Sequence, residues 1–261
     1  MKTFNYHSAK DVKEASKLSS SNSAFLAGGM TTLPSMKLGL ASYKDIIDIK
    51  RIKKLSGIKV SGKTVTIGAT TKHAEVAKSK DIKKAIPSLA ALAEGIGDPQ
   101  VRNRGTIGGS IANNDPAADY PSACIALNAV IHTNSRKIDA DKFFKGMFET
   151  SLKSSEIIEA IEFNIPQKSS YQKLPNPASR YAIVGVYVAK HKKGINVGVT
   201  GAKSSVYNDK NLAGALSKNF SSSAIDNVKI STSGMNSDIH ASAEYRANMV
   251  KAFAKKAVDA C

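Results

Sequence analysis

The chain has 261 residues, a hydrophobic content of 42% and a formal net charge of +17, from 38 Lys and Arg against 21 Asp and Glu. This length is enough for two modest domains, each with its own core. No apolar run approaches the roughly 20 residues that a membrane helix needs. The start of the chain turns polar at once, unlike a signal peptide, so a cytoplasmic location is expected.

Composition also narrows the class of ligand. The positive excess is mostly lysine spread along the whole chain, aromatic content is 6%, and tryptophan is absent. This composition argues against nucleic-acid binding and favours a solvated surface or docking to acidic partner subunits. Two cysteines, Cys124 and Cys261, are too few for an iron–sulfur cluster, and no Cys or His pair has the spacing of zinc ligands. We therefore expect no metal site in this chain.

The opening of the chain reads as a β-α-β-loop-α-β unit. Apolar runs predict strands at 4–6, 24–27 and 45–49. Helical spacing predicts an amphipathic helix over 9–20, with Ser8 as its N-cap. After the second strand comes a glycine pair, and a short helix is expected over 33–38 with proline in its first turn.

The rest of the chain alternates between helical and extended patterns. Period-two alternation predicts a hairpin at 58–60 and 64–67. Further helices are expected at 71–79, 82–95, 120–128, 208–218 and 241–260, the last with an apolar stripe of Tyr245, Met249, Ala252, Phe253 and Val258. Further strands are expected at 129–133, 157–163, 181–191, 195–202 and 228–230. A linker at 167–170 and a turn at 175–177 divide this α+β chain into domains 1–168, with subdomains of about 1–55 and 56–168, and 169–261.

Two glycine pairs are the most informative feature of the sequence: Gly28-Gly29, and Gly108-Gly109 within the stretch 97–119. Glycine lacks a Cβ atom and adopts positive φ readily, so successive N–H groups in a glycine loop can turn toward one anion. Hydroxyl donors surround both pairs, and two such loops suit a pyrophosphate. Asn114 and Asp119 are candidates for contact with sugar hydroxyls. Neither the G-x-G-x-x-G nor the P-loop pattern is present, so a nucleotide site and a pair of tight turns both stay open on these residues alone.

Four blocks, in this order, resemble the FAD-binding medium subunit of the molybdenum hydroxylases, the group that includes aerobic carbon monoxide dehydrogenase and xanthine dehydrogenase. They are residues 27–37, 97–119, 171–173 with 177–186, and 238–246. The resemblance covers nearly the full chain. It implies a two-subdomain, PCMH-type FAD-binding domain, followed by a smaller α+β C-terminal domain with an antiparallel sheet and a terminal helix.

The resemblance also implies a set of cofactor contacts and no catalytic residue in this chain. The two glycine stretches would hold the pyrophosphate, Asp119 a cofactor hydroxyl, and two isoleucines the rings. Lys173 would lie close to the flavin, where a cation stabilises the anionic reduced form. Neither loop has a Cys or His for covalent attachment, so non-covalent FAD is expected. The full set is Leu26, Ala27, Gly28, Gly29, Met30, Thr31, Thr32, Leu33, Ile96, Thr106, Ile107, Gly108, Gly109, Ser110, Asn114, Asp119, Ile158 and Lys173.

The function implied is that of an oxidoreductase subunit. In the family, substrate is oxidised at a molybdenum cofactor on a large subunit, and electrons pass through two [2Fe-2S] clusters on a small subunit to this FAD. An external acceptor, a quinone or NAD, then takes them. The blocks look most like carbon monoxide dehydrogenase-type medium chains, which would make the complex a dimer of heterotrimers. A xanthine, aldehyde or heterocycle dehydrogenase subunit, a stand-alone flavin oxidase, a basic binding module and peripheral membrane contact stay open as alternatives.

Overall fold

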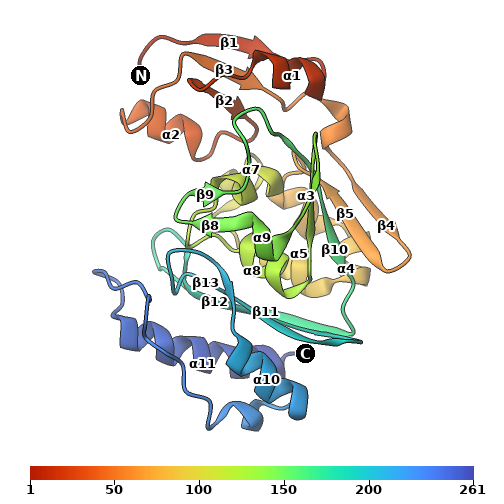
Figure 1. Ribbon diagram of the computed structural model, residues 1–261, viewed down its shortest axis with the longest axis vertical. Coiled ribbons are helices and arrows are strands. Elements are labelled where there is room, and N and C mark those ends of the chain that lie inside the picture. Colours follow the sequence, from red (N-terminus) through yellow and green to blue (C-terminus); the bar gives the residue numbers. More distant parts are fainter.

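Three sheets follow one another along the long axis of the computed structural model, which describes residues 1–261 (Figure 1). The first is a parallel sheet in the order β1-β3-β2, with β3 in the centre. Its elements are β1 (Asn5–Ser8), α1 (Val12–Leu18), β2 (Ser23–Leu26), α2 (Thr32–Lys37) and β3 (Asp45–Asp48). Helix α1 begins later than expected, because the Asp11 carboxylate, and not Ser8, caps it by accepting a hydrogen bond from the Glu14 N–H at 2.8 Å.

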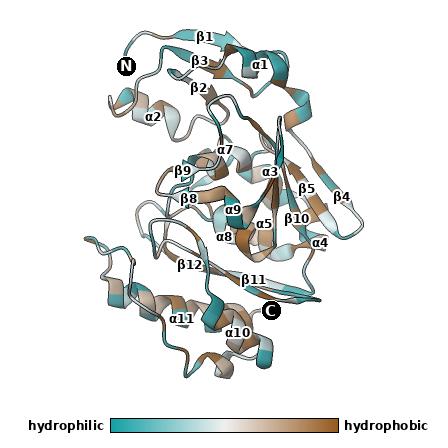
Figure 2. Ribbon diagram, viewed as in Figure 1, coloured by the Kyte–Doolittle hydropathy of each residue, from teal (hydrophilic) through white to brown (hydrophobic).

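The second sheet is antiparallel, in the order β4-β5-β10-β6-β7, and helices pack against it. Its strands are β4 (Ile58–Ser61), β5 (Thr64–Gly68), β6 (Val130–Thr133), β7 (Lys137–Asp139) and β10 (Ile158–Asn164). The helices are α3 (His73–Lys78), α4 (Lys80–Ala85), α5 (Pro87–Glu94), α6 (Pro99–Arg102), α7 (Ile107–Asn113), α8 (Tyr120–Ala126) and α9 (Ala140–Phe143), next to a small hairpin of β8 (Phe144–Gly146) and β9 (Glu149–Thr150). Hydrophobic segments concentrate in this central part, around α5, α8 and β10, whereas the outer α1 and β1 are hydrophilic (Figure 2).

The third sheet is antiparallel, in the order β11-β12-β13-β14. It consists of β11 (Lys168–Pro175), β12 (Ala182–His191), β13 (Gly194–Thr200) and β14 (Tyr207–Asn208), and α10 (Lys210–Lys218), the 3-10 turn η2 (Ser222–Ile225) and α11 (Ala243–Asp259) lie below it (Figure 1). Because side chains alternate across a strand, β12 serves two cores. Val184, Val186 and Val188 pack with α10 and α11, while Tyr187 and Ala189 belong to the central core.

Three local expectations are wrong. The helix expected over 82–95 is broken between α4 and α5, because Pro87 has no N–H to continue it. The expected linker at 167–170 runs into strand β11. The strand expected at 228–230 is absent, although Val228 and Ile230 pack against the C-terminal core. The stretch 97–119, for which no helix or strand was predicted, contains α6 and α7.

The apolar stripe of α11 is also displaced from the expected one. The buried apolar face is formed by Ala247, Val250, Ala254, Ala257 and Val258, whereas Tyr245 is exposed. Small side chains occupy the face because the helix lies close against the sheet, and the larger residues that dominate the apolar pattern lie at its margin. None of the helices is both long and apolar enough to cross a membrane.

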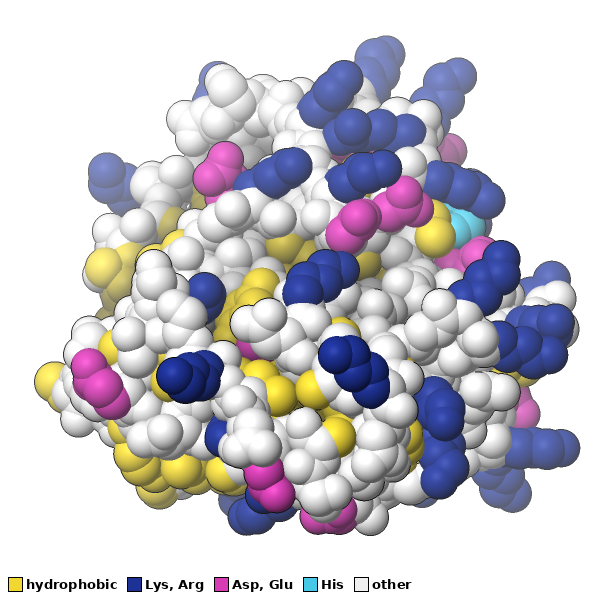
Figure 3. Space-filling view, turned by 60° about the horizontal axis from the view of Figure 1, so that its bottom comes forward, with side chains coloured by type: hydrophobic (Ala, Val, Ile, Leu, Met, Phe, Trp, Pro, Cys, Tyr) yellow, Lys and Arg dark blue, Asp and Glu magenta, His cyan; other side chains and the backbone are white.

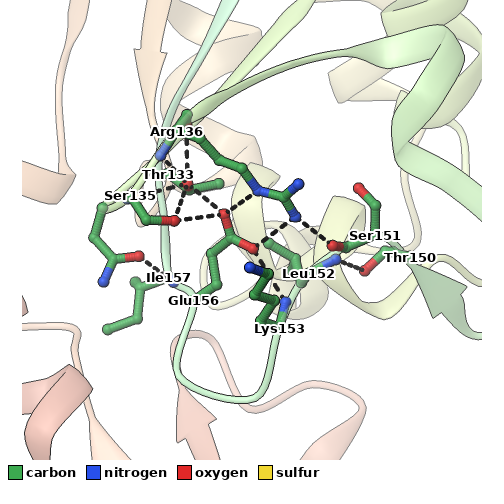
Figure 4. Close-up of polar contacts among 10 residues, drawn as sticks. Thr133, Ser135, Arg136, Thr150, Ser151, Leu152, Lys153, Glu156 and Ile157 are labelled. Atoms are coloured by element: carbon green, nitrogen blue, oxygen red, sulfur yellow. Dashed lines mark hydrogen bonds and ion pairs between the residues drawn. The ribbon is translucent and has the colours of Figure 1, made fainter.

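Each of the three large sheets forms a structural unit together with the helices that pack on it. The buried carboxylate of Glu156 organises the connection between the first two units (Figure 4). Glu156 accepts hydrogen bonds from Arg136 at 2.9 and 3.0 Å, from Thr133 at 2.7 Å and from Ser135 at 2.9 Å. The Arg136 guanidinium and these donors lower the pKa of Glu156 to about 2. The residues just before Glu156 carry the contact to α1. The Ser16 hydroxyl in α1 donates to Ser155 O, and the hydroxyl of its C-cap residue Ser19 donates to Ser154 O.

Candidate cofactor site

A cavity of about 450 Å³ opens where segments from all three units meet. The first unit contributes the loop after β2, the second unit contributes α7 and the segments around α6, and the third contributes the connection between β11 and β12. Its lining residues are Phe25, Ala27, Gly28, Gly29, Met30, Thr31, Thr32, His73, Ile96, Gly97, Val101, Gly105, Thr106, Gly109, Ser110, Ala112, Asn113, Asp115, Ala118, Asp119, Ser179, Arg180 and Tyr181.

The loop 28–32 presents a row of unused donors to this cavity. None of its five backbone N–H groups donates a hydrogen bond within the protein, and all five residues line the cavity. Gly29 has a φ of +76°, which turns the chain at this point. Gly28 is required for a different reason, because a Cβ atom there would lie 2.3 Å from the Arg104 carbonyl oxygen. The loop therefore packs closely on the second unit, and its unpaired N–H groups are available to an anion in the cavity.

The second glycine pair is built differently from the first. The Ile107 and Gly108 N–H groups donate to Thr71 O and Ala69 O at 3.1 and 2.8 Å, and the Gly109 N–H donates to the Thr106 hydroxyl at 3.2 Å. These residues begin helix α7, so their donors are already paired. A Cβ atom on Gly109 would meet only the Thr106 hydroxyl oxygen, at 2.9 Å, and the Ala27 Cβ, at 4.0 Å. Gly109 thus offers a bare surface for close approach of a ligand, with the Ser110 side chain beside it.

Asp119 lies in the wall of the cavity and is 4% exposed. Its Oδ1 accepts a hydrogen bond from the Tyr171 hydroxyl at 2.5 Å and pairs with Lys173 Nζ at 3.0 Å. Burial raises the pKa of Asp119, while the Lys173 ammonium and the Tyr171 hydroxyl oppose that rise. No protein group donates to its Oδ2.

Lys173 does not line the cavity. Its ammonium donates to Gly95 O at 2.9 Å and to Arg180 O at 3.0 Å, in addition to its pairing with Asp119. All three N–H donors of the lysine are therefore used within the protein. The side chain fastens the end of α5 and the β11–β12 connection to the start of α8.

Several expected contacts lie outside the cavity lining. The Asn114 amide donates to Gly146 O and Glu149 O, both at 2.8 Å, and the residue takes the left-handed conformation that ends α7. Ile158 is buried in the central core. The others outside the lining are Leu26, Leu33, Ile107, Gly108 and Lys173, whereas Ile96 and the remaining expected residues line it.

Sequence reasoning missed several side chains that line the cavity, among them His73, Arg180 and Tyr181. His73 comes from the start of α3, where a single histidine carries no recognisable signal. Arg180 and Tyr181 come from the β11–β12 connection, in a block that carried the family resemblance without an assigned role. Arg180 adopts a positive φ of 62°, and its guanidinium donates to the carbonyl oxygen of Gly97, another lining residue, at 3.3 Å.

The comparisons with known proteins agree with this geometry. Residues 2–168 match the family described as "FAD binding domain in molybdopterin dehydrogenase". The carbon monoxide dehydrogenase medium chain of Hydrogenophaga pseudoflava is 34% identical over 98% of this chain and 96% of that protein. The glyceraldehyde dehydrogenase medium chain of Sulfolobus acidocaldarius is 38% identical over 73% of this chain and 71% of that protein.

A solved structure of the Hydrogenophaga pseudoflava carbon monoxide dehydrogenase superposes with a TM-score of 0.90 at 33% identity, covering 99% of this chain and 97% of that chain. The xanthine dehydrogenase FAD-binding subunit of Escherichia coli O157:H7 is 29% identical over 60% of this chain and 56% of that protein. These matches confirm the predicted resemblance, the α+β fold with its antiparallel sheet and terminal helix, and FAD as the cofactor. The chain belongs to the FAD-binding medium subunits of the molybdenum hydroxylases, and is therefore an oxidoreductase subunit.

Proposed function

We propose that this chain is the electron-transfer flavoprotein of a molybdenum hydroxylase, and that the cavity between its three units holds FAD without a covalent bond. The observation that carries the proposal is the row of five unpaired N–H groups at residues 28–32. Unpaired N–H groups in residues that line a cavity are a natural partner for a pyrophosphate. The bare surface of Gly109 and the Ser110 side chain complete the site from the opposite wall.

The chain's own residues bind and orient the cofactor, and the bound flavin supplies the redox chemistry. Asp119 Oδ2 is the oxygen available to accept from a cofactor hydroxyl, since Oδ1 is occupied. Ile96 and Tyr181 contribute to the apolar surface of the cavity. Lys173 acts indirectly, because its ammonium holds Asp119 and the β11–β12 connection in place.

The substrate is oxidised on another subunit under this proposal. No group of three or more His, Cys, Asp or Glu in this chain is placed to hold a metal ion, which fits a molybdenum cofactor and [2Fe-2S] clusters on the large and small partners. We favour a carbon monoxide dehydrogenase-type complex, a dimer of heterotrimers, that passes electrons to a quinone or NAD. A xanthine, aldehyde or heterocycle dehydrogenase is the second candidate, since the relatives include medium chains of glyceraldehyde dehydrogenase and nicotine 6-hydroxylase.

Part of the positive charge of the chain gathers on one segment, where it can attract an acidic partner subunit. Residues 50–84 contain 11 Lys and Arg against two Asp and Glu, and all 11 are exposed. They lie in the segment before β4, on β4, in the β4–β5 turn, just before α3, and on α3 and α4. Figure 3 shows Lys and Arg side chains gathered along this side of the molecule. We propose that this basic face docks on an acidic partner subunit, so that assembly weakens as salt rises.

Purification of the tagged chain from its host tests the function directly. The complex should be yellow and contain FAD, molybdenum and iron, and carbon monoxide should bleach its flavin absorbance. A complex with flavin but neither molybdenum nor iron would contradict the proposal. Bleaching by an aldehyde or a heterocycle, but not by carbon monoxide, would select the second candidate.

The Gly109→Val variant tests the cavity as the FAD site. A valine there fills the bare surface and should abolish FAD retention while the apo chain keeps its circular dichroism spectrum. Gly214→Val is the matched control, because no atom lies within 4 Å of a Cβ at Gly214 in α10. Normal flavin content in Gly109→Val would refute this placement of FAD.

A further inference from the structure

His73 carries a polar atom that the protein leaves without a partner. The residue begins α3, is 5% exposed and lines the cavity. Its Nδ1 is buried and makes no hydrogen bond. The Tyr120 ring lies 5.4 Å away between centroids, and the Tyr120 hydroxyl is likewise buried without a partner. Buried polar groups are nearly always paired, so an unpaired imidazole in the wall of a ligand cavity calls for an explanation beyond packing.

The imidazole lies directly behind the loop that presents the free donors. A Cβ atom on Gly28 would be 2.8 Å from the Gly105 Cα, and a Cβ on Gly105 would be 2.6 Å from His73 Nε2. Gly28, Gly105 and His73 are therefore stacked in contact, with no side chain between them. An anion held by residues 28–32 would lie within electrostatic reach of the imidazole.

The surroundings of His73 keep its imidazole neutral while the cavity holds no anion. Burial, followed by the charge of Arg102, lowers the pKa of His73 to about 4. Arg102 is fixed nearby, since its guanidinium donates to Ile96 O and Gly97 O, both at 2.9 Å.

The other titratable or charged groups around the imidazole are few. The buried face of α5 is formed by Ser88, Leu89, Ala90, Leu92 and Ala93, and the buried residue of α4 is Ile82. Helix α8 presents Tyr120 and, at its start, Asp119, which is bound to Lys173. Asp115 and Arg180 line the same cavity. Asp115 and Asp119 are further groups whose protonation could respond to a ligand, because burial raises the pKa of each carboxyl.

We propose that His73 couples FAD binding to a proton, its imidazole becoming an imidazolium when the anionic part of the cofactor enters the cavity. This inference rests on the proposed FAD site and deepens it. The negative charge of the pyrophosphate opposes the effect of burial and of Arg102, and so favours the protonated ring. His73 accordingly stabilises the charged part of FAD electrostatically, and affinity for FAD should rise as pH falls.

The direction of this pH dependence follows from the linkage between proton binding and FAD binding. The free chain binds this proton only near pH 4, whereas the FAD-bound chain binds it at higher pH. Between the two pKa values the complex holds one more proton than its components. The dissociation constant for FAD should then fall by up to tenfold for each unit of pH lowered, and above the higher pKa it should become independent of pH.

Calorimetric titration of the flavin-free full chain with FAD counts this proton. Titrations at pH 6 in two buffers of different ionisation enthalpy should show net proton uptake in the wild type. His73→Gln should bind FAD with no uptake and with a flatter pH dependence between pH 5 and 8. Asp115→Asn is the matched control and should retain the uptake. No uptake by the wild type anywhere in this range would overturn the proposal, as would unchanged uptake in His73→Gln.

A second measurement needs no variant. In the wild type labelled with ¹⁵N-histidine, the spectrum at pH 6 should show one ring changing from neutral imidazole to imidazolium when FAD is added. If every ring keeps its protonation state, His73 does not couple binding to a proton. If FAD does not bind at any pH, the proposed FAD site fails as well, which separates that failure from failure of the coupling alone.

Discussion

Replacing Lys173 with methionine would remove the ammonium that fastens three segments around the cavity. The substitution keeps an apolar stem of similar length, so the loss is confined to the charge and its contacts with Asp119, Gly95 and Arg180. The Lys173 and Asp119 side chains are 10% and 5% exposed, respectively. Removing one partner of such a pair leaves a buried carboxylate without a counter-charge, which typically costs about 3–5 kcal/mol.

Protonation of Asp119 sets an upper limit to that cost. A carboxyl with an ordinary pKa of about 3.9 can be neutralised at pH 7 for about 4 kcal/mol, and at pH 5 for about 1.5 kcal/mol. The folded variant holds this proton, so the penalty should grow as pH rises above the unfolded pKa. We therefore expect Lys173→Met to lose about 3–4 kcal/mol of unfolding free energy at pH 7 and about 1–2 kcal/mol at pH 5.

Urea denaturation followed by circular dichroism at both pH values measures these losses. Lys168→Met, on the same strand but exposed, is the control and should change stability by less than about 0.5 kcal/mol. The double variant Lys173→Met with Asp119→Asn should recover part of the loss, because its buried group is neutral. A loss below about 1 kcal/mol for Lys173→Met at pH 7, or no difference between the two pH values, would refute this account of the pair.

Three further predictions concern the framework of the site. Glu156→Gln should remove about 2 kcal/mol of stability above pH 4.5, after allowance for the half-exposed Arg136. The wild type should lose the same contribution as pH falls from 4.5 towards 2, as thermal unfolding across pH would show. Gly28→Ala should destabilise the chain by about 1–3 kcal/mol and lower its flavin content, because the new Cβ meets the Arg104 carbonyl; an unchanged melting temperature would contradict that contact. Thr106→Ala should cost about 1 kcal/mol by uncapping α7, and Thr106→Ser should restore it in the same melting assay.

Much of the fold follows from local sequence patterns. The strands expected at 24–27, 45–49 and 64–67 correspond to β2, β3 and β5, because alternation and apolar runs report burial within a few residues. The helix break at Pro87 has an equally local cause, the missing N–H of proline, although the apolar spacing over 82–95 predicted one continuous helix. The strand at 168–175 was not predictable in this way. Its polar residues show no alternating pattern, and its extended conformation is fixed by hydrogen bonding to β12.

The family, the cofactor and the two glycine stretches could be predicted from the sequence alone, because only glycine allows a ligand or a neighbouring segment to approach the backbone so closely. Which glycine pair keeps its donors free was decided only in the tertiary structure. The N–H groups of Ile107 and Gly108 are taken by carbonyls from the segment after β5, while those of residues 28–32 have no partner. The positions of Lys173, Asn114 and His73 were decided in the same way, because their neighbours come from segments that the chain brings together only on folding.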